Sequence, residues 1–222
     1  SQIRGLDAAI RNANDAISMV DTAEGALDEI TAMLQRMREL GVQAATGTTD
    51  SADRTYLQSE FAALRTEIDR IVDNTQWNGR NILDGSAGAS TGASTVAFGI
   101  GQDGTAAQTL STSFGNFSDS DGKLSGLASK VITGTTIASA ITTSAAAVAE
   151  IDVVIADVSS QRATFGAVSN RLTHAVDNLT NVKTNSEEAR SRILDTDYAS
   201  ATSDLARTQI IQQAGTAMLS QA

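Results

Sequence analysis

Few residues in this sequence have the type and spacing that catalysis or metal binding requires. His174 is the only histidine and cysteine is absent. The zinc motif HExxH is missing, and so is the phosphate-binding Walker loop. Gly99-Ile100-Gly101 is not followed by the helix that a dinucleotide-binding fingerprint requires. A solvent-facing histidine is therefore a better interpretation of His174 than a ligand or a general base. We expect no catalytic residue, no cofactor and no enzymatic activity.

One short acidic motif is similar to part of a cation-binding loop. Asp119-Ser120-Asp121-Gly122 supplies oxygens at alternate positions, as calcium loops do. The carboxylate that such a loop needs further downstream is missing, and a hard cation takes six or more oxygens. We favour a solvated turn at these residues and predict no metal site.

Composition excludes several classes of partner. The 222 residues carry a net charge of −10, which argues against nucleic acid and against an anionic membrane surface. No run of eighteen apolar residues exists, so we expect no membrane insertion. Proline is absent and aromatic residues make up only 4% of the chain. Long helices packed by alanine, leucine, isoleucine and valine need neither.

The elements that must position any functional surface are long helices. Leu27, Ile30, Leu34 and Met37 recur at spacings of three and four residues, and the pattern extends back to Ile3. A helix over residues 3–44 is roughly 60 Å long at 1.5 Å per residue, so other elements must lie beside it. A second helix, capped by Asp50 or Ser51 and ending near Asn74, is expected to return antiparallel to the first. A third begins near Ser144 and keeps a heptad-like apolar spacing to a break near residues 195–197.

The middle of the sequence has a different pattern. Trp77 precedes Asn78-Gly79, a strong turn pair, and is expected to fill the core between helix ends. Alternating residues predict strands over 96–100 and 109–114, joined by a turn at Gln102-Asp103-Gly104. Residues 115–143 are rich in serine, threonine and glycine. We predict a mainly α protein: a discontinuous antiparallel helical bundle over residues 1–84 and 145–222, with a β-hairpin and small β-containing, solvent-facing tip over residues 85–144.

Several motifs resemble the two conserved ends of bacterial flagellin. They are RNANDAIS (11–18), TAEGALDEI (22–30), LQRMRELGVQA (34–44), EIDRIVDNTQWNGRNIL (67–83), ARSRILDTDYA (189–199) and QIIQQAGTAMLSQA (209–222). The motifs are long and occur in the family's order. Residues 85–144 have no recognisable match.

The resemblance implies a structural subunit of the flagellar filament that self-assembles to support motility. It implies an extracellular location and secretion through the flagellar channel as an unfolded chain. Its partners are expected to be other flagellin subunits, with an export chaperone and cap proteins. The family also implies further residues before Ser1 and after Ala222 that form the filament's inner tube. Residues 1–222 alone are therefore expected to be monomeric.

The same resemblance points to a contact surface. In the family, the motif that contains Gln35, Arg36, Arg38, Glu39 and Leu40 contributes to the contact along a protofilament. It also contributes to recognition by Toll-like receptor 5, and Glu60 matches the acidic partner on the second helix. From the residues alone, a solvated face on which Arg36 and Arg38 pair with nearby carboxylates is the simpler interpretation. Both interpretations remain open at the level of the sequence.

Two other functions compete with that of the filament subunit. The hook–filament junction protein shares both terminal signatures, although the completeness of LQRMRELGVQ and QIIQQAGTAMLSQA favours flagellin. A surface adhesin that binds a polysaccharide through residues 85–144 belongs to a different class. Sugar sites usually need aromatic platforms, and Phe98, Phe114 and Phe117 are the only candidates there.

Overall fold

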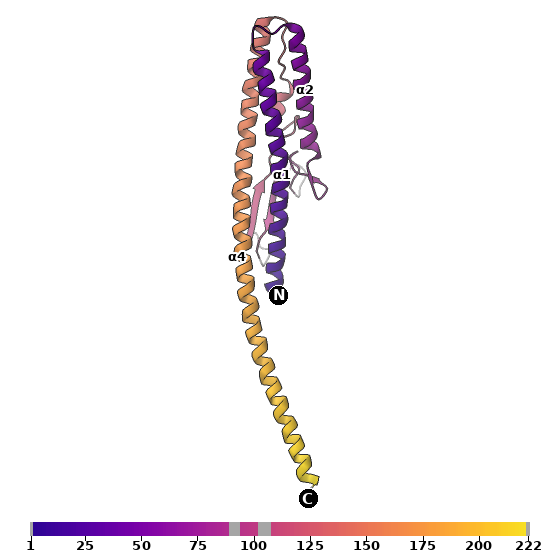
Figure 1. Ribbon diagram of the computed structural model, residues 1–222, viewed down its shortest axis with the longest axis vertical. Coiled ribbons are helices and arrows are strands. Elements are labelled where there is room, and N and C mark those ends of the chain that lie inside the picture. The colour runs from indigo at the N-terminus through magenta and orange to yellow at the C-terminus, as the bar shows by residue number, and fades with distance from the viewer. Residues whose placement is uncertain (1, 89–93, 102–107, 221–222) are drawn as a thin grey trace.

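The computed structural model describes residues 2–88, 94–101 and 108–220, and most of them lie in helices that run side by side (Figure 1). The elements in chain order are α1 (Gln2–Ala44), α2 (Ser51–Asn74), β1 (Gln76–Trp77), β2 (Arg80–Asn81), β3 (Thr95–Gly99), β4 (Thr109–Ser113), α3 (Ser125–Ala128) and α4 (Ile137–Ser220). The predicted fold class, mainly helical with a small antiparallel β part, is confirmed.

The first helix is the axis of the bundle and contacts both α2 and α4. The centre of its apolar stripe is fully buried at Leu27, Ile30, Leu34 and Met37, and the stripe is only partly buried at Ile3, Ile10 and Ile17. With 43 residues it is roughly 65 Å long. A helix of this length is held by tertiary packing of its apolar stripe more than by intrinsic propensity.

The second helix returns along the first after a short connection. Asp50 caps it, because Asp50 Oδ1 accepts hydrogen bonds from the backbone N–H groups of Ala52 (2.7 Å) and Asp53 (2.9 Å). One turn later Arg54 is 2% exposed, and its guanidinium donates to the carbonyls of Ala44 and Thr46 at 3.0 Å each. Those carbonyls lie at and just beyond the end of α1, so the buried arginine satisfies acceptors that the helix itself leaves unpaired.

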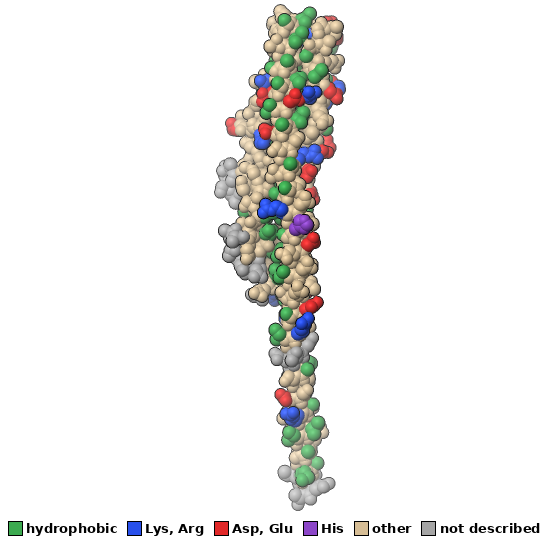
Figure 2. Space-filling view, turned by 90° about the vertical axis from the view of Figure 1, so that its left-hand side faces the viewer, with side chains coloured by type: hydrophobic (Ala, Val, Ile, Leu, Met, Phe, Trp, Pro, Cys, Tyr) green, Lys and Arg blue, Asp and Glu red, His purple; other side chains and the backbone are tan. Residues whose placement is uncertain are grey.

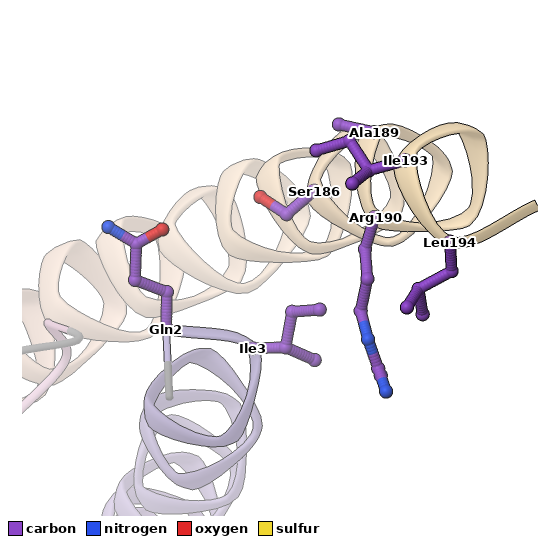
Figure 3. Close-up of a pocket in the computed structure, with 7 residues that line it drawn as sticks. All are labelled: Gln2, Ile3, Ser186, Ala189, Arg190, Ile193 and Leu194. Atoms are coloured by element: carbon purple, nitrogen blue, oxygen red, sulfur yellow. The ribbon is translucent and has the colours of Figure 1, made fainter. Parts of the chain in front are cut away.

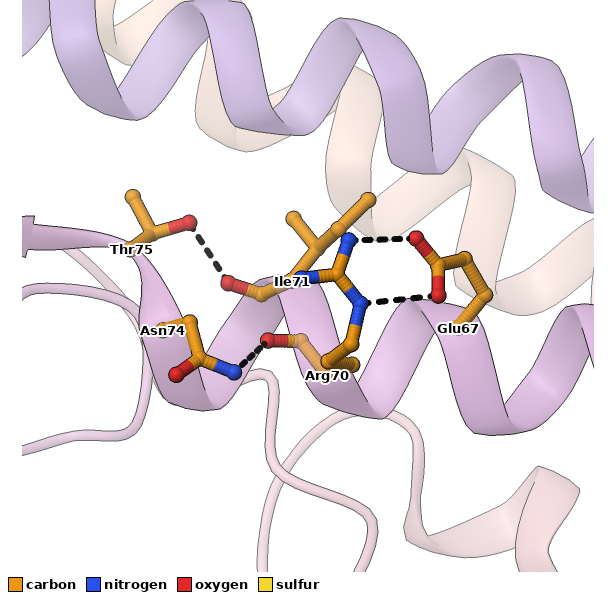
Figure 4. A network of polar contacts seen from close by, with 5 residues as sticks. All are labelled: Glu67, Arg70, Ile71, Asn74 and Thr75. Atoms are coloured by element: carbon orange, nitrogen blue, oxygen red, sulfur yellow. Dashed lines mark hydrogen bonds and ion pairs between the residues drawn. The ribbon is translucent and has the colours of Figure 1, made fainter.

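Side-chain hydrogen bonds also mark the other end of α2 (Figure 4). Asn74 Nδ2 donates to the Arg70 carbonyl at 2.7 Å, and Thr75 Oγ1 donates to the Ile71 carbonyl at 2.6 Å. The Arg70 guanidinium donates hydrogen bonds to both carboxylate oxygens of Glu67, and these bonds lower the pKa of Glu67. Side-chain donors therefore satisfy backbone carbonyls in the last turn of α2, just before the chain enters β1.

Two antiparallel strand pairs follow α2. In the first, Trp77 pairs with Arg80 across Asn78-Gly79, whose φ angles of 50° and 75° suit the predicted turn. Trp77 is partly buried against the core, as expected of a residue that fills it. The second pair, β3 with β4, runs in register from Thr95 opposite Ser113 to Gly99 opposite Thr109. This is the predicted β-hairpin, and its predicted turn at residues 102–104 lies outside the described residues.

The segment that follows the hairpin packs against the helices. Residues 115–136, here called the strap, contain α3 and carry four fully buried apolar side chains: Phe117, Leu124, Leu127 and Ile132. Ion pairs from Lys123 to Asp157 (3.3 Å) and from Lys130 to Glu150 (3.8 Å) join the strap to α4. The sequence places residues 85–144 in a solvent-facing tip, but the apolar side chains of the strap belong to the same core as the helices. Sparse leucines and phenylalanines in a serine- and glycine-rich stretch give no periodic signal, although each one is buried.

The last helix is longer than its sequence pattern predicts. It begins at Ile137 rather than near Ser144, and it continues through residues 195–197, where we expected a break. Its 84 residues span roughly 125 Å. Beyond the start of α1 it projects alone from the bundle (Figure 1). Figure 2 shows hydrophobic side chains on the surface of that extension. The exposed large apolar side chains there are Ile193, Leu194, Tyr198, Leu205, Ile210, Ile211 and Met218.

One stretch of α4 also bears on the expectation of no membrane insertion. Averaged over eighteen residues, part of α4 is apolar enough to cross a bilayer. Helices that pack in a protein core have the same composition, so this average is weak support for a span. The absence of membrane insertion stays a prediction.

Candidate functional site

Four of the six predicted contact residues lie exposed on the bundle surface of α1: Gln35, Arg36, Arg38 and Glu39. Glu60 is exposed on α2. Leu40 differs, because it is fully buried in the core. Its place in the motif reflects the apolar stripe of α1, so Leu40 is not available as a direct contact in this structure. We call Gln35, Arg36, Glu39 and Glu60 the α1–α2 contact surface; Arg38 is exposed on the side of α1 that faces α4.

Arg36 is the centre of this surface. Its Nε donates to Glu60 Oε1 at 2.8 Å, and its Nη1 donates to Glu39 Oε2 at 3.0 Å. The hydrogen bonds to Glu39 and Glu60 raise the pKa of Arg36, in that order of size. The three side chains remain between 45% and 69% exposed, so solvent screens the pairs. Arg36 joins α1 to α2 and leaves the cluster open to a partner.

Arg38 turns to the opposite neighbour. Its Nε donates to Asp152 Oδ1 on α4 at 2.7 Å, and this hydrogen bond raises the pKa of Arg38. The helical spacing of two residues separates Arg36 and Arg38 by roughly 200° around α1. The structure therefore does not bring the two arginines together: one faces α2 and the other faces α4.

Asp152 belongs to a series that fixes α1 against α4. The pairs of this series are Lys183–Asp7 (2.7 Å), Arg162–Asp28 (3.0 Å) and Arg38–Asp152 (2.7 Å). From pair to pair the chain advances 21 and then 10 residues along α1, and it goes back the same 21 and 10 residues along α4. The two helices thus keep one antiparallel register over this length. The sequence pattern alone does not predict which of these residues pair, although charged positions beside an apolar stripe are where such pairs are found.

A groove lies where α1 begins beside α4 (Figure 3). It has a volume of about 700 Å³, and its walls are Gln2, Ile3, Ser186, Ala189, Arg190, Ile193 and Leu194. Arg190 is the only ionisable side chain among them, so the groove lacks the paired acid and base that hydrolytic chemistry needs.

Other chemical motifs find no support among the described residues. No group of three or more histidine, aspartate or glutamate side chains is placed to hold a metal ion in the described part of the chain. His174 is exposed on α4. Residues 88–92 and 99–104 have the glycine spacings GxSxG and GxGxxG, but both lie largely outside the described residues. The next described element after each is a strand, β3 or β4, and not the helix that these motifs require.

Comparison with known proteins places both ends of the chain in one family. The bacterial flagellin N-terminal helical region matches residues 1–88, and the bacterial flagellin C-terminal helical region matches residues 148–222. Flagellin A of Vibrio cholerae serotype O1 is 33% identical over 312 residues, covering the whole chain and 82% of the relative. Flagellin of Bacillus subtilis is 40% identical over 240 residues, covering the whole chain and 78% of the relative.

A solved structure agrees with this result. The crystal structure of Bacillus cereus flagellin superposes with a TM-score of 0.61 at 30% identity, covering 81% of this chain and 94% of that one. The match covers most of a crystallised flagellin. The helical arrangement described above is therefore one that an experimentally determined flagellin also has.

Proposed function

Because this chain belongs to the bacterial flagellin family and is a structural subunit of the flagellar filament, we propose that its α1–α2 contact surface is where a neighbouring subunit binds. The family assembles with further flagellin subunits into an extracellular bacterial filament. A contact between subunits must use a surface that the bundle does not already bury. Gln35, Arg36, Glu39 and Glu60 form such a surface, with both signs of charge, and Arg38 is exposed beside α4.

The arrangement of Arg36 supports this proposal. A guanidinium has five N–H donors in a rigid fork and can hold more than one carboxylate. Arg36 reaches Glu39 and Glu60 from an exposed position, so a neighbour that brings a further acceptor can join the cluster without dismantling the core. The competing interpretation, a solvated face with internal pairs only, predicts that loss of Arg36 leaves assembly unchanged.

Sedimentation of assembled filaments separates the two interpretations. The Bacillus subtilis relative extends beyond the region it shares with this chain, so its outer segments can be fused to residues 1–222 to supply a longer subunit. We expect residues 1–222 alone to stay monomeric and the fused chain to sediment as filaments. In the fused chain, Arg36→Ala is expected to raise the critical concentration for assembly. Arg70→Ala removes another exposed arginine, from α2, and is the matched control: the Arg70 side chain is 60% exposed and that of Arg36 is 49% exposed. Equal behaviour of the two variants rejects the proposed contact.

Recognition by Toll-like receptor 5 is proposed for the same surface. Reporter cells that carry the receptor are expected to respond less to Arg36→Ala and Glu60→Ala than to Arg70→Ala. A normal response of all three variants removes this surface as the receptor site. Binding to an export chaperone and to the cap proteins, and secretion as an unfolded chain, are proposed from the family. Co-purification with each partner tests them.

We propose no catalytic activity, in keeping with a family of structural proteins. The adhesin alternative receives no support from the aromatic residues that it needs. Phe114 and Phe117 are fully buried, and the Phe114 ring packs 5.2 Å from that of Phe165. Only Phe98 of the three candidate platforms keeps partial exposure.

A further inference from the structure

The strap is attached to α2 by few polar contacts. Arg65 Nη1 donates to the Ala128 carbonyl at 2.5 Å, and the Ile132 N–H donates to Gln58 Oε1 at 2.7 Å. Phe117 anchors the start of the strap, where its N–H donates to the Leu83 carbonyl at 2.7 Å. Between these anchors the strap places Asp119 against Asp69 of α2.

The two carboxyl groups meet in an unusual way. Asp69 Oδ1 and Asp119 Oδ1 are both sealed from solvent, and neither receives a hydrogen bond from any donor in the described part of the chain. The Asp119 carboxyl nevertheless lies within hydrogen-bonding reach of the Asp69 carboxyl. A buried acceptor without a donor is costly, and two ionised carboxylates in contact repel each other. A single proton removes both problems, because one carboxyl then donates to the other.

The surrounding charges do not supply the missing donor. The groups that act on Asp69 are Arg65 and Asp73 from α2 and Asp119 from the strap. Asp73 adds negative charge, and the Arg65 fork is directed at the Ala128 carbonyl with its Nε left without an acceptor. Burial, and then the charge of Asp119, raise the pKa of Asp69 to about 6. The two Oδ1 atoms are out of contact with bulk water, whereas a proton shared between the carboxyl groups needs no further space.

We propose that Asp69 and Asp119 share one proton that fastens the strap to α2, and that loss of this proton near neutral pH loosens the strap while the helices stay folded. The motif around Asp119 is thus more than the solvated turn that its sequence predicts. Its loop is shaped by hydrogen bonds from the Ser118 N–H to Asn116 Oδ1 and from the Gly122 N–H to the Ser118 carbonyl.

The sign of the pH effect follows from the raised pKa. An aspartate in the unfolded chain ionises near pH 3.8, but Asp69 in the folded chain keeps its proton until about pH 6. Stability from this pair is therefore complete below pH 3.8, falls as the pH rises, and is lost above about pH 6. Two pKa units correspond to about a hundredfold change in an equilibrium. Asp69 is only partly buried, so we expect a change on the order of tenfold.

Hydrogen exchange of the whole chain tests the proposal. Protection factors, which correct for the intrinsic pH dependence of exchange, are compared at pH 4.5 and pH 7.5. We expect protection of the Phe117 and Ile132 amides to fall on the order of tenfold, while amides in the buried part of α1 keep theirs. Asp69→Asn supplies a permanent donor to Asp119, so its strap should stay protected at both pH values. Asp121→Asn, which removes an exposed carboxyl group from the strap, is the matched control and should behave as the unmodified chain.

Two further measurements keep the proposal open to rejection. An NMR titration of the Asp69 carboxyl carbon should show an apparent pKa of about 6, and titration of this group below about 4.5 overturns the shared proton. Addition of calcium at pH 7.5 is the second. Recovery of strap protection with calcium identifies a cation site instead, and no recovery supports the proton.

Discussion

Arg38 and Asp152 are 114 residues apart in the sequence, yet Arg38 Nε donates to Asp152 Oδ1 at 2.7 Å across the junction of α1 and α4. The pair holds the same register as Lys183–Asp7 and Arg162–Asp28 further down the bundle. It lies on the side of α1 that faces α4, about half exposed. The residue that the family motif marks for contact between subunits therefore also contributes to contact within one.

The two roles of Arg38 predict different effects of its substitution on monomer stability and on filament assembly. Exposed ion pairs contribute little to stability, since solvent screens them. Arg38→Ala and Asp152→Ala are therefore expected to leave the urea midpoint of the monomer unchanged within error. If Arg38 also contacts a neighbour, Arg38→Ala should still weaken filament assembly. Double-mutant cycles on Arg38 and Asp152 measure the coupling of the two residues in monomer unfolding and in filament assembly. If Arg38→Ala lowers monomer stability as much as it weakens assembly, Arg38 acts within the bundle alone.

Substitution of Arg54, which lies outside every family motif, is expected to destabilise the monomer. Its guanidinium is buried and satisfies two carbonyls at the end of α1. Arg54→Ala removes the side-chain donor of the Ala44 carbonyl and one donor of the Thr46 carbonyl, which also accepts from the Thr49 N–H at 3.3 Å. We therefore expect the free energy of unfolding to fall by about 1–3 kcal/mol. Arg54→Lys should restore little, because one ammonium does not reproduce the fork. Urea unfolding of both variants measures this, and an unfolding free energy within about 0.5 kcal/mol of the parent chain contradicts it.

Two glycines of α1 should respond in opposite ways to alanine. A Cβ at Gly41 meets Val148 Cγ2 at 2.7 Å, whereas a Cβ at Gly25 meets nothing within 4 Å. Gly25→Ala should stabilise by about 0.5–1 kcal/mol through helix propensity. At Gly41 the steric clash outweighs that gain, with a net loss of about 1 kcal/mol. Thermal unfolding of the two variants gives the comparison, and stabilisation by both rejects the close approach of α1 and α4.

Leu40 and Gln35 share the family motif but not a role. Leu40 is fully buried, so Leu40→Ala should lower the free energy of unfolding by about 2–5 kcal/mol through lost burial and a cavity. Gln35 is exposed, and Gln35→Ala should stay within about 0.5 kcal/mol of the parent chain. Any defect of Leu40→Ala in receptor activation or filament assembly should then be explained by its lower free energy of unfolding. A defect in Leu40→Ala at full monomer stability indicates that this residue reaches a partner after all.

The extension of α4 is predicted to be the least protected helix. Its apolar residues from Ile193 to Met218 are exposed, and an isolated helix gains no tertiary packing. Amides in this extension should exchange orders of magnitude faster than those near Ile151 and Phe165, whose side chains are fully buried. Hydrogen exchange read by mass spectrometry measures the contrast. Assembly into a filament that covers the extension should remove this difference in exchange rate.

Local patterns in the sequence carry much of this fold. Apolar spacing of three and four residues placed α1 and α2 within a residue or two of their observed ends, because one stripe must be buried whatever its partner is. Asn78-Gly79 and the alternating residues around the hairpin indicated their turns and strands for a similarly local reason: few residues tolerate the φ angles of such a turn. The family motifs at both ends were identified from the residues alone.

Tertiary structure decided everything that depends on distant partners. Whether Leu40 faces a neighbour or the core, which helix Arg36 and Arg38 each reach, and where Arg54 finds its carbonyls follow from the positions of α2 and α4 around α1. The burial of the strap and the meeting of Asp69 with Asp119 belong to the same class. Hydrophobic burial and electrostatic desolvation act between groups brought together by the fold. A one-dimensional pattern records which residues can take part, and the packing of the chain selects their partners.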